Sequence, residues 1–195
     1  VGGALNATAT TGNMTDSGAL AITGTTTLTT SANNATIALD TTTNAFTGAV
    51  TITTNDDSGT DADVTIDGGT TALILAASTI DGDLTVRSGN ASGITDSGTL
   101  TVGGALSATA TTGNMTDSGA LAITGTTTLV TSADNATIAL DTTTNAFTGA
   151  VTITTNDNSG TDADVIIDGG TTALVLAAST IDGDLMLRSG HASGI

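Results

Sequence analysis

The sequence predicts an all-β protein built as a parallel β-solenoid of about eight coils, and three observations lead to this class. The 195 residues include 48 Thr and 25 Gly but no Pro, Lys, Glu or Gln, which favours strands and turns over helices. Residues 1–94 recur at 102–195 with an offset of 101 and nine differences. A shorter period of 21–29 residues recurs inside each unit, which is the size of one solenoid coil.

The long repeat divides one continuous solenoid into residues 1–101, expected to form four coils, and the near-identical residues 102–195. An aspartate closes each coil, so that the first complete coils are 17–40, 41–67, 68–96 and 97–117. We expect these carboxylates to stack from coil to coil and to accept hydrogen bonds from the backbone of their turns. The coil-closing residues are Asp16, Asp40, Asp67, Asp96, Asp117, Asp141 and Asp168.

A glycine marks a corner once per coil, and an apolar residue stands two positions before it. We expect a corner where only glycine tolerates the backbone angle, after a strand residue that points inward. These corner glycines are Gly3, Gly24, Gly48, Gly82, Gly104, Gly125, Gly149 and Gly183.

Each coil is expected to hold three short strands. After each corner glycine, apolar and hydroxyl residues alternate, as in 25–29, 49–53 and 83–87, which predicts a strand with one buried face. Another strand precedes each coil-closing aspartate, as in 37–39 and 64–66. Its apolar positions do not keep a constant distance from the aspartate, which indicates a bulge or a one-residue slip.

Composition excludes several classes of function. The formal charge of −17 and the presence of only two basic residues, Arg87 and Arg188, argue against nucleic-acid binding. We expect each arginine to pair with an aspartate on an adjacent coil. The chain lacks Cys and has one histidine, His191, so no thiolate site, zinc centre or histidine triad is expected. There is no run of 18 apolar residues, so we expect no membrane insertion.

An enzymatic role is not expected either. A polysaccharide-cleaving β-helix needs a few unique carboxylates in a cleft, whereas nearly every aspartate here is duplicated. The chain contains no Trp or Tyr to hold a sugar, so polysaccharide binding is also the weaker interpretation.

The stretches 55–63 and 156–164 are rich in oxygen ligands that suit Ca²⁺. They lack the spacing of an EF-hand or of the glycine-rich nonapeptide repeat, so a solvated loop is the preferred interpretation, with no cofactor. The weak Ca²⁺ candidates are Asp56, Asp57, Asp61, Asp63, Asp157, Asp162 and Asp164.

The runs 94–104, 19–24, 44–52 and 82–86 resemble the stalk repeats of giant bacterial surface proteins, namely filamentous-haemagglutinin-like, two-partner-secretion and autotransporter adhesins. The resemblance extends over essentially the whole chain and concerns a style of repeat. It implies a right-handed β-helix, an extracellular or cell-surface location, and a role as a shaft, matrix fibre or adhesin.

These observations predict a structural segment of a bacterial extracellular fibre that associates with itself end to end, and possible lateral bundling is left open. Val1 and Ile195 both fall in mid-coil, so we expect the stack of coils to continue past both. The alternative function is ice binding, because outward Thr-x-Thr rows such as those in 51–53 could order water. Interruptions by Asn6, Arg87 and Val130 count against it.

Overall fold

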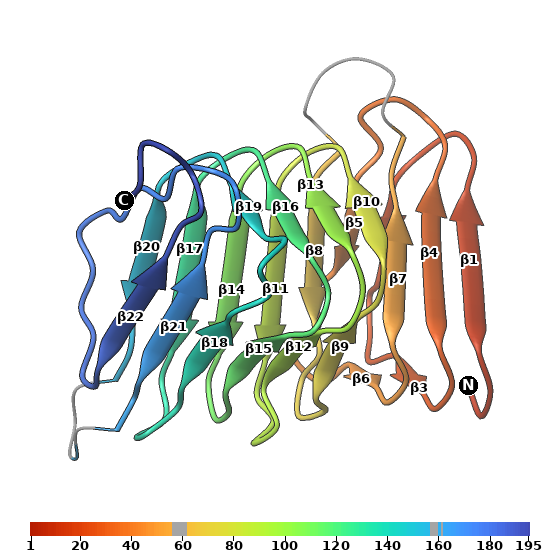
Figure 1. Cartoon of the computed structure of the whole chain (residues 1–195). Coiled ribbons are helices and arrows are strands. Elements are labelled where there is room, and N and C mark those ends of the chain that lie inside the picture. The colour runs from red at the N-terminus through yellow and green to blue at the C-terminus, as the bar shows by residue number, and fades with distance from the viewer. Residues whose placement is uncertain (56–61, 157–159, 161) are drawn as a thin grey trace.

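The computed structural model describes residues 1–55, 62–156, 160 and 162–195, and in this part of the chain it is all-β. Short parallel strands stack coil upon coil into a β-solenoid of about eight turns (Figure 1). The prediction of fold class is therefore confirmed. Among the described residues, no helix is long and apolar enough to cross a membrane.

Most turns contain three short strands, as predicted. In the first half of the chain the strands are β1 (Leu5–Ala9), β2 (Met14–Thr15), β3 (Ala21–Ile22), β4 (Thr26–Thr30), β5 (Ile37–Leu39), β6 (Ala45–Phe46), β7 (Val50–Thr53), β8 (Val64–Asp67), β9 (Leu73–Leu75), β10 (Ser78–Ile80) and β11 (Leu84–Ser88). The second half contains β12 (Ile94–Asp96), β13 (Leu100–Val102), β14 (Leu106–Ala110), β15 (Met115–Asp117), β16 (Leu121–Ile123), β17 (Thr127–Thr131), β18 (Ile138–Leu140), β19 (Ala146–Phe147), β20 (Val151–Thr154), β21 (Val165–Asp168) and β22 (Leu185–Arg188).

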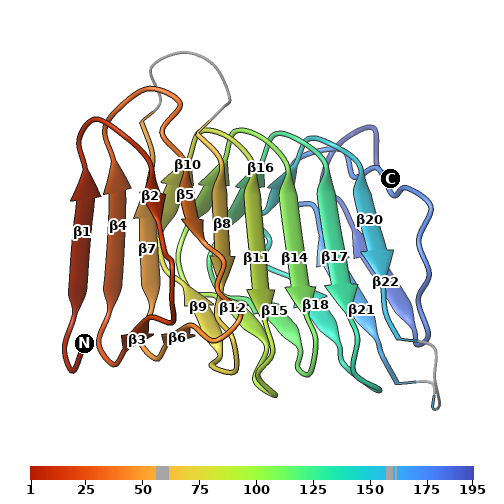
Figure 2. The same ribbon diagram turned by 180° about the vertical axis from the view of Figure 1, so that it is seen from behind.

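The coil is right-handed. With the N-terminus at the right of Figure 1, strands such as β10 and β13 run upward on the near face. From behind, in Figure 2, strands such as β8, β11 and β14 run downward on the near face. Partner residues in neighbouring coils are 20 to 27 positions apart, so the pairing that builds the sheets is parallel and non-local.

One 101-residue unit spans about four and a half turns, and the expectation of four coils per unit was wrong. One column runs from β1 through β4 and β7, and then continues as the pairs β9/β10, β12/β13, β15/β16 and β18/β19. The opposite column runs through β2, β5, β8, β11, β14, β17 and β20. Because β14 is the copy of β1 and lies in the other column, the second unit is rotated by half a turn from the first.

The half turn arises at residues 68–80, which belong to the predicted coil 68–96. Here β9 and β10 together cover the single strand β7: Leu75 pairs with Val50, and Thr79 pairs with Thr53. Two short strands thus replace one long strand in this column. From here on, the five-residue strands lie on the opposite side of the solenoid.

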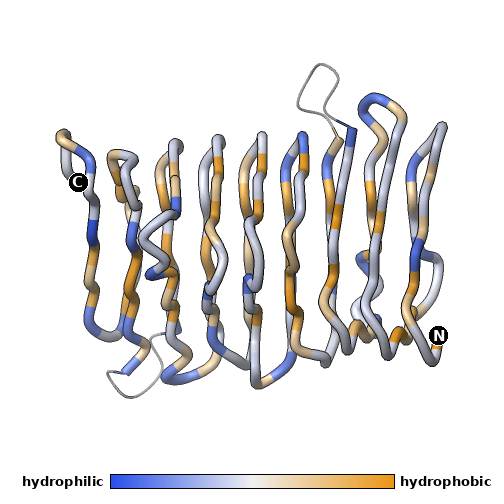
Figure 3. The backbone as a smooth tube through the Cα atoms, turned by 45° about the vertical axis from the view of Figure 1, so that its right-hand side comes forward, coloured by the Kyte–Doolittle hydropathy of each residue, from blue (hydrophilic) through white to orange (hydrophobic). Residues whose placement is uncertain are grey.

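The interior is a thin apolar stack. The predicted alternation holds, since β4 buries Thr26, Leu28 and Thr30 and turns Thr27 and Thr29 outward. Figure 3 shows apolar positions recurring at matching heights in successive coils. Phe46 and Phe147 are the largest fully buried side chains, so each unit places one aromatic ring in its core.

The irregular register before the aspartates has a simple cause, and no bulge is needed. In the column formed by β9, β12, β15 and β18, Leu75 pairs with Asp96 and Asp96 pairs with Asp117. Continuing the β15–β18 register brings Leu140 next. Two aspartates therefore occupy inward positions that leucines occupy in the adjacent coils, whereas Asp40 and Asp141 follow the inward residue and are exposed.

Candidate functional site

Close approach between coils requires glycine at seven of the eight corners, with Gly3 as the exception, and the expectation of a special backbone angle was wrong. None of the eight has a positive φ. The amide of Gly24 donates to the carbonyl of Gly3 at 3.0 Å, and a Cβ on Gly48 would lie 2.5 Å from the carbonyl oxygen of Gly24. The corner glycines form two ladders on opposite sides of the solenoid. Gly3 and Gly24 belong to one ladder; Gly82 and Gly104 belong to the other, in which the amide of Gly104 donates to the carbonyl of Gly82.

The coil-closing aspartates are likewise divided between the two columns, so the single stack that was expected does not exist. The expected turn hydrogen bond is present at Asp67 and Asp168, whose Oδ1 atoms accept from the amide two residues later at 2.7 and 2.8 Å. Arg87 lies 3.9 Å from Asp67 on the adjacent coil, as expected for an arginine among aspartates, and this half-exposed ion pair contributes little stability.

Asp16 and Asp117 make a different contact, which reaches the following coil. Asn44 donates to Oδ2 of Asp16 at 2.7 Å, and Asn145 donates to Oδ2 of Asp117 at 2.6 Å. These asparagines are 1% exposed and also donate to a backbone carbonyl of their own coil. Sequence reasoning missed them, although the repeated run TTTNAF could have indicated a buried amide before the core phenylalanine.

Among the described residues, Asp96 has the most unusual environment of any carboxyl group. It is 4% exposed, its Oδ2 has no hydrogen-bond partner, and it adjoins a small cavity lined mainly by leucines and other apolar residues. Burial raises the pKa of Asp96 to about 7; Asp117 adds to the rise, and the amides of Gly98 and Gly119 oppose it. Burial also raises the pKa of Asp117, against the hydrogen bonds from Asn145, Thr142 and Asp141.

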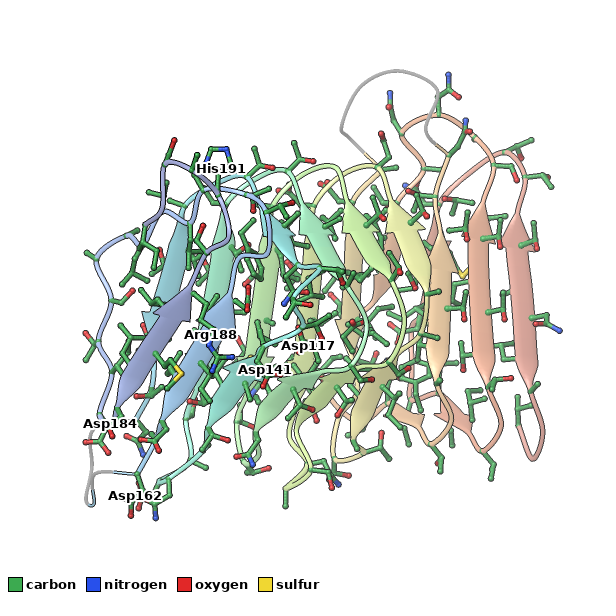
Figure 4. The ribbon with its side chains drawn as sticks, viewed as in Figure 1. Asp117, Asp141, Asp162, Asp184, Arg188 and His191 are labelled. Atoms are coloured by element: carbon green, nitrogen blue, oxygen red, sulfur yellow. The ribbon has the colours of Figure 1, made fainter. Side chains whose placement is uncertain are left out.

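Some of the Ca²⁺ candidates, Asp56, Asp57, Asp61 and Asp157, lie outside the described residues. Asp63 and Asp164 are described, and each accepts a hydrogen bond from the backbone of the next coil, at Asp83 N and Asp184 N, both at 2.8 Å. Asp162 is exposed near the lower edge in Figure 4. Within the described ranges, no group of three or more acidic or histidine side chains could hold a metal ion.

His191 lies at the upper edge in Figure 4, away from the labelled aspartates. Its Nδ1 accepts from the amide of Ser193 at 3.0 Å, just as Oδ1 of Asn90 accepts from Ser92 at 2.8 Å in the first unit. The histidine therefore repeats the turn contact of the asparagine it replaces. In the same view, Arg188 lies on the face that carries Asp117 and Asp141.

The two ends of the stack are the surfaces where the core is least covered. At the C-terminal end, Leu185 and Met186 of β22 are 40% and 48% exposed, whereas Leu84, the copy of Leu185 inside the stack, is fully buried. At the N-terminal end, Leu5, Met14 and Leu20 line a hollow of about 510 Å³.

Outward threonines form rows along the solenoid. One row joins Thr8, Thr29, Thr53, Thr79 and Thr101 in hydrogen-bonded register and continues as Ala122. A parallel row runs from Asn6 through Thr27 to Thr51, so a double row of hydroxyls exists over β4 and β7.

This geometry defines the protein as a β-solenoid repeat protein whose described residues are held together by backbone hydrogen bonds between neighbouring coils. The chain belongs to the family described as "Repeats of unknown function (DUF5649)", whose sequence model matches residues 1–53, 61–110 and 99–154. No curated protein and no solved structure gives a significant match.

Proposed function

We propose that this chain is a structural segment of a bacterial extracellular or cell-surface fibre, such as an adhesin shaft, extended by stacking further units along the solenoid axis. The observation that carries the proposal is the relation between the two units. A rotation by half a turn, with about four and a half coils of advance, keeps the core stack continuous and leaves Gly82 of the first unit in line with Gly104 of the second. Repetition of this step produces a straight rod of any length.

The surface supports the same role. The formal charge of −17 and exposed aspartates such as Asp40, Asp83 and Asp141 make the surface acidic, which keeps a long rod soluble and separate from its neighbours. Where carboxylates approach one another, several are tied to the next coil through backbone amides, as at Asp63 and Asp83. Because nearly every aspartate is duplicated between units, we assign the chain no chemistry of its own.

The test is the length of designed arrays in electron micrographs. At about 4.8 Å per coil, four and a half turns give an advance of roughly 22 Å per unit. Arrays of two, four and eight units should therefore appear as unbranched rods whose length grows by this increment. Globular clusters, or rods that do not lengthen with repeat number, would rule out the shaft.

Ice binding is the second candidate, and the double row of hydroxyls over β4 and β7 is the observation that favours it. The row is short, and on the other face Val130 and Arg87 interrupt the equivalent positions. Thermal hysteresis, or uptake of the purified protein by a growing ice crystal, separates the two functions. A Thr27→Val, Thr29→Val double variant should leave rod formation intact and abolish any ice activity.

A further inference from the structure

The chain contains several triplets of asparagine, any residue except proline, and threonine or serine, which is the acceptor sequence for N-linked sugars. Six such triplets begin at Asn6, Asn13, Asn34, Asn90, Asn114 and Asn135. Two positions keep the triplet in both units, namely Asn13 with its copy Asn114 and Asn34 with its copy Asn135. Such triplets arise readily by chance in a threonine-rich chain, so the environment of each asparagine decides which of them can react.

Asn34 and Asn135 occupy equivalent corners, after the long strands β4 and β17. Among the described residues they are the two non-glycine residues with a positive φ, 59° and 62°, and both are exposed. The amide of Ala35 donates to Ala32 O at 3.3 Å, and the buried hydroxyl of Thr30 donates to Ala35 O at 3.2 Å. The second unit repeats both contacts at the same distances. The corner is therefore anchored to the core, while the asparagine at its tip faces solvent.

The side-chain amides of these two corner asparagines have no hydrogen-bond partner within the described residues. The residues just before them, Asn33 and Asp134, make the contacts of the corner instead, since each accepts a hydrogen bond from the adjacent coil at 2.6 Å. Thr36, the third residue of the first triplet, lies between two buried residues and turns its side chain outward. Gly160 lies beside the amide of Asn135 and, as a glycine, has no side chain that could cover it. Both the amide and the threonine of the triplet are therefore accessible.

The other triplet that occurs in both units is held against the following coil. Oδ1 of Asn13 accepts a hydrogen bond from Thr36 N at 3.0 Å. Its copy does the same, because Oδ1 of Asn114 accepts from Thr137 N at 2.9 Å. Either amide must break this contact before it can turn into the active site of an enzyme.

The two triplets that occur in one unit only are less suitable. Asn90 uses both ends of its amide: Nδ2 donates to Thr70 O at 2.6 Å, and Oδ1 accepts from Ser92 N at 2.8 Å. Asn6 lies within β1, whose backbone is held in a ladder with β4. Neither position is an asparagine in the second unit.

We propose that Asn34 and Asn135 are sites of N-linked glycosylation. In this step the side-chain nitrogen Nδ2 attacks the anomeric carbon of a sugar that is activated as a diphosphate ester. A carbon–nitrogen bond forms, the bond from the anomeric carbon to the phosphate oxygen breaks, and the diphosphate leaves with the electron pair. The amide proton passes to a base of the transferase, an enzyme that the cell supplies. The proposal depends on the geometry of the two corners and not on the assignment of the chain to a cell-surface fibre.

The half turn between the units determines where the sugars lie. In Figure 2, β4 points to the upper edge of the solenoid and β17 points to the lower edge, and the two corners follow these strands. The two sugars therefore lie on opposite edges. Because the corner asparagines stand outside the strands, a sugar on either one leaves the coil-to-coil ladders and the apolar core undisturbed.

The experiment treats the folded full chain with a purified N-glycosyltransferase that accepts Asn-Ala-Thr peptides, with a nucleoside diphosphate glucose as the sugar donor. Tandem mass spectrometry then locates the attached glucose. The two corner asparagines should be modified about tenfold faster than Asn13, Asn114 and Asn90, since each of the slower sites must first break a hydrogen bond. Short synthetic peptides that contain the same triplets lack the folded contacts, so they should react at similar rates.

Two pairs of variants serve as matched controls. Thr36→Ala with Thr137→Ala should abolish modification at the corners, whereas Thr36→Ser with Thr137→Ser keeps both triplets and should retain it. Asn34→Gly with Asn135→Gly suits the positive φ, so this variant should keep its melting temperature and accept no sugar at the corners. Modification of Asn13 as fast as that of Asn34 in the folded chain, or no sugar at either corner, would refute the proposal.

Discussion

We expect Asp96 to make the free energy of unfolding depend on pH. Replacing Asp96 by Asn should remove most of this dependence. Asp96 is 4% exposed, lies between Leu75 and Asp117 in the inward column, and has an unpartnered Oδ2. Burial raises its pKa to about 7 from an ordinary 3.8. The folded protein therefore favours the neutral acid, while the unfolded chain releases the proton near pH 4.

Because the pKa of Asp96 is higher in the folded than in the unfolded state, the free energy of unfolding should fall as the pH rises. Below pH 4 the carboxyl is neutral in both states and costs nothing. As the pH rises from 4 to 7 the unfolded state gains the charge first, so the free energy of unfolding falls, and above pH 7 the loss is complete. At about 1.4 kcal/mol per pKa unit, the difference between 3.8 and about 7 gives an upper limit of about 4 kcal/mol for the loss.

The assay is urea denaturation at pH 4, 5, 6, 7 and 8, followed by far-ultraviolet circular dichroism because the chain has no Trp or Tyr. The stability of D96N relative to the native protein should rise by a few kcal/mol from pH 4 to pH 8. The control, Asp40→Asn, removes the same charge from an exposed position. Parallel pH profiles for D96N and the native protein would show that Asp96 ionises normally and that the reasoning fails.

Three further predictions follow from the core, the corners and the acidic loops. Phe46→Ala should lower the free energy of unfolding by about 3 to 5 kcal/mol in the same denaturation assay, because a fully buried ring leaves a cavity in a thin stack. Gly48→Ala should cost about 2 kcal/mol or more, since its Cβ would lie 2.5 Å from Gly24 O, whereas Gly18→Ala, with nothing within 4 Å, should be nearly neutral. A chelator should leave the melting temperature unchanged, and a fall of many degrees would instead indicate bridging Ca²⁺ in the acidic loops.

Sequence patterns predict much of the architecture. Alternation after each corner glycine predicts which residues face inward, and Leu28 and Ile52 are buried accordingly. The absence of Pro agrees with continuous hydrogen-bonded ladders along the axis. None of the predicted corner glycines has a positive φ, and glycine is needed at positions such as Gly24 and Gly48 because neighbouring coils approach closely there.

The buried polar groups were harder to foresee. Asp96 is the last residue of β12 and Asp40 directly follows β5, yet Asp96 lies in the core column and Asp40 in solvent. The difference is a single position in register, and register depends on which residue of another coil lies opposite. The contacts of Asn44 with Asp16 and with Leu39 O depend on the same pairing.

The sequence by itself determined the class of fold, the approximate coil length and the inward face of the long strands, because alternation and turn residues act within a few positions of the chain. Only the tertiary structure decided that a unit takes about four and a half turns and that successive units face opposite ways. One side of a coil can be built from one five-residue strand or from two short strands with a bend between them. Either arrangement spans the same distance and buries apolar residues. The choice between them at residues 68–80 is made by contact with β7, more than 20 residues away, which local sequence patterns do not encode.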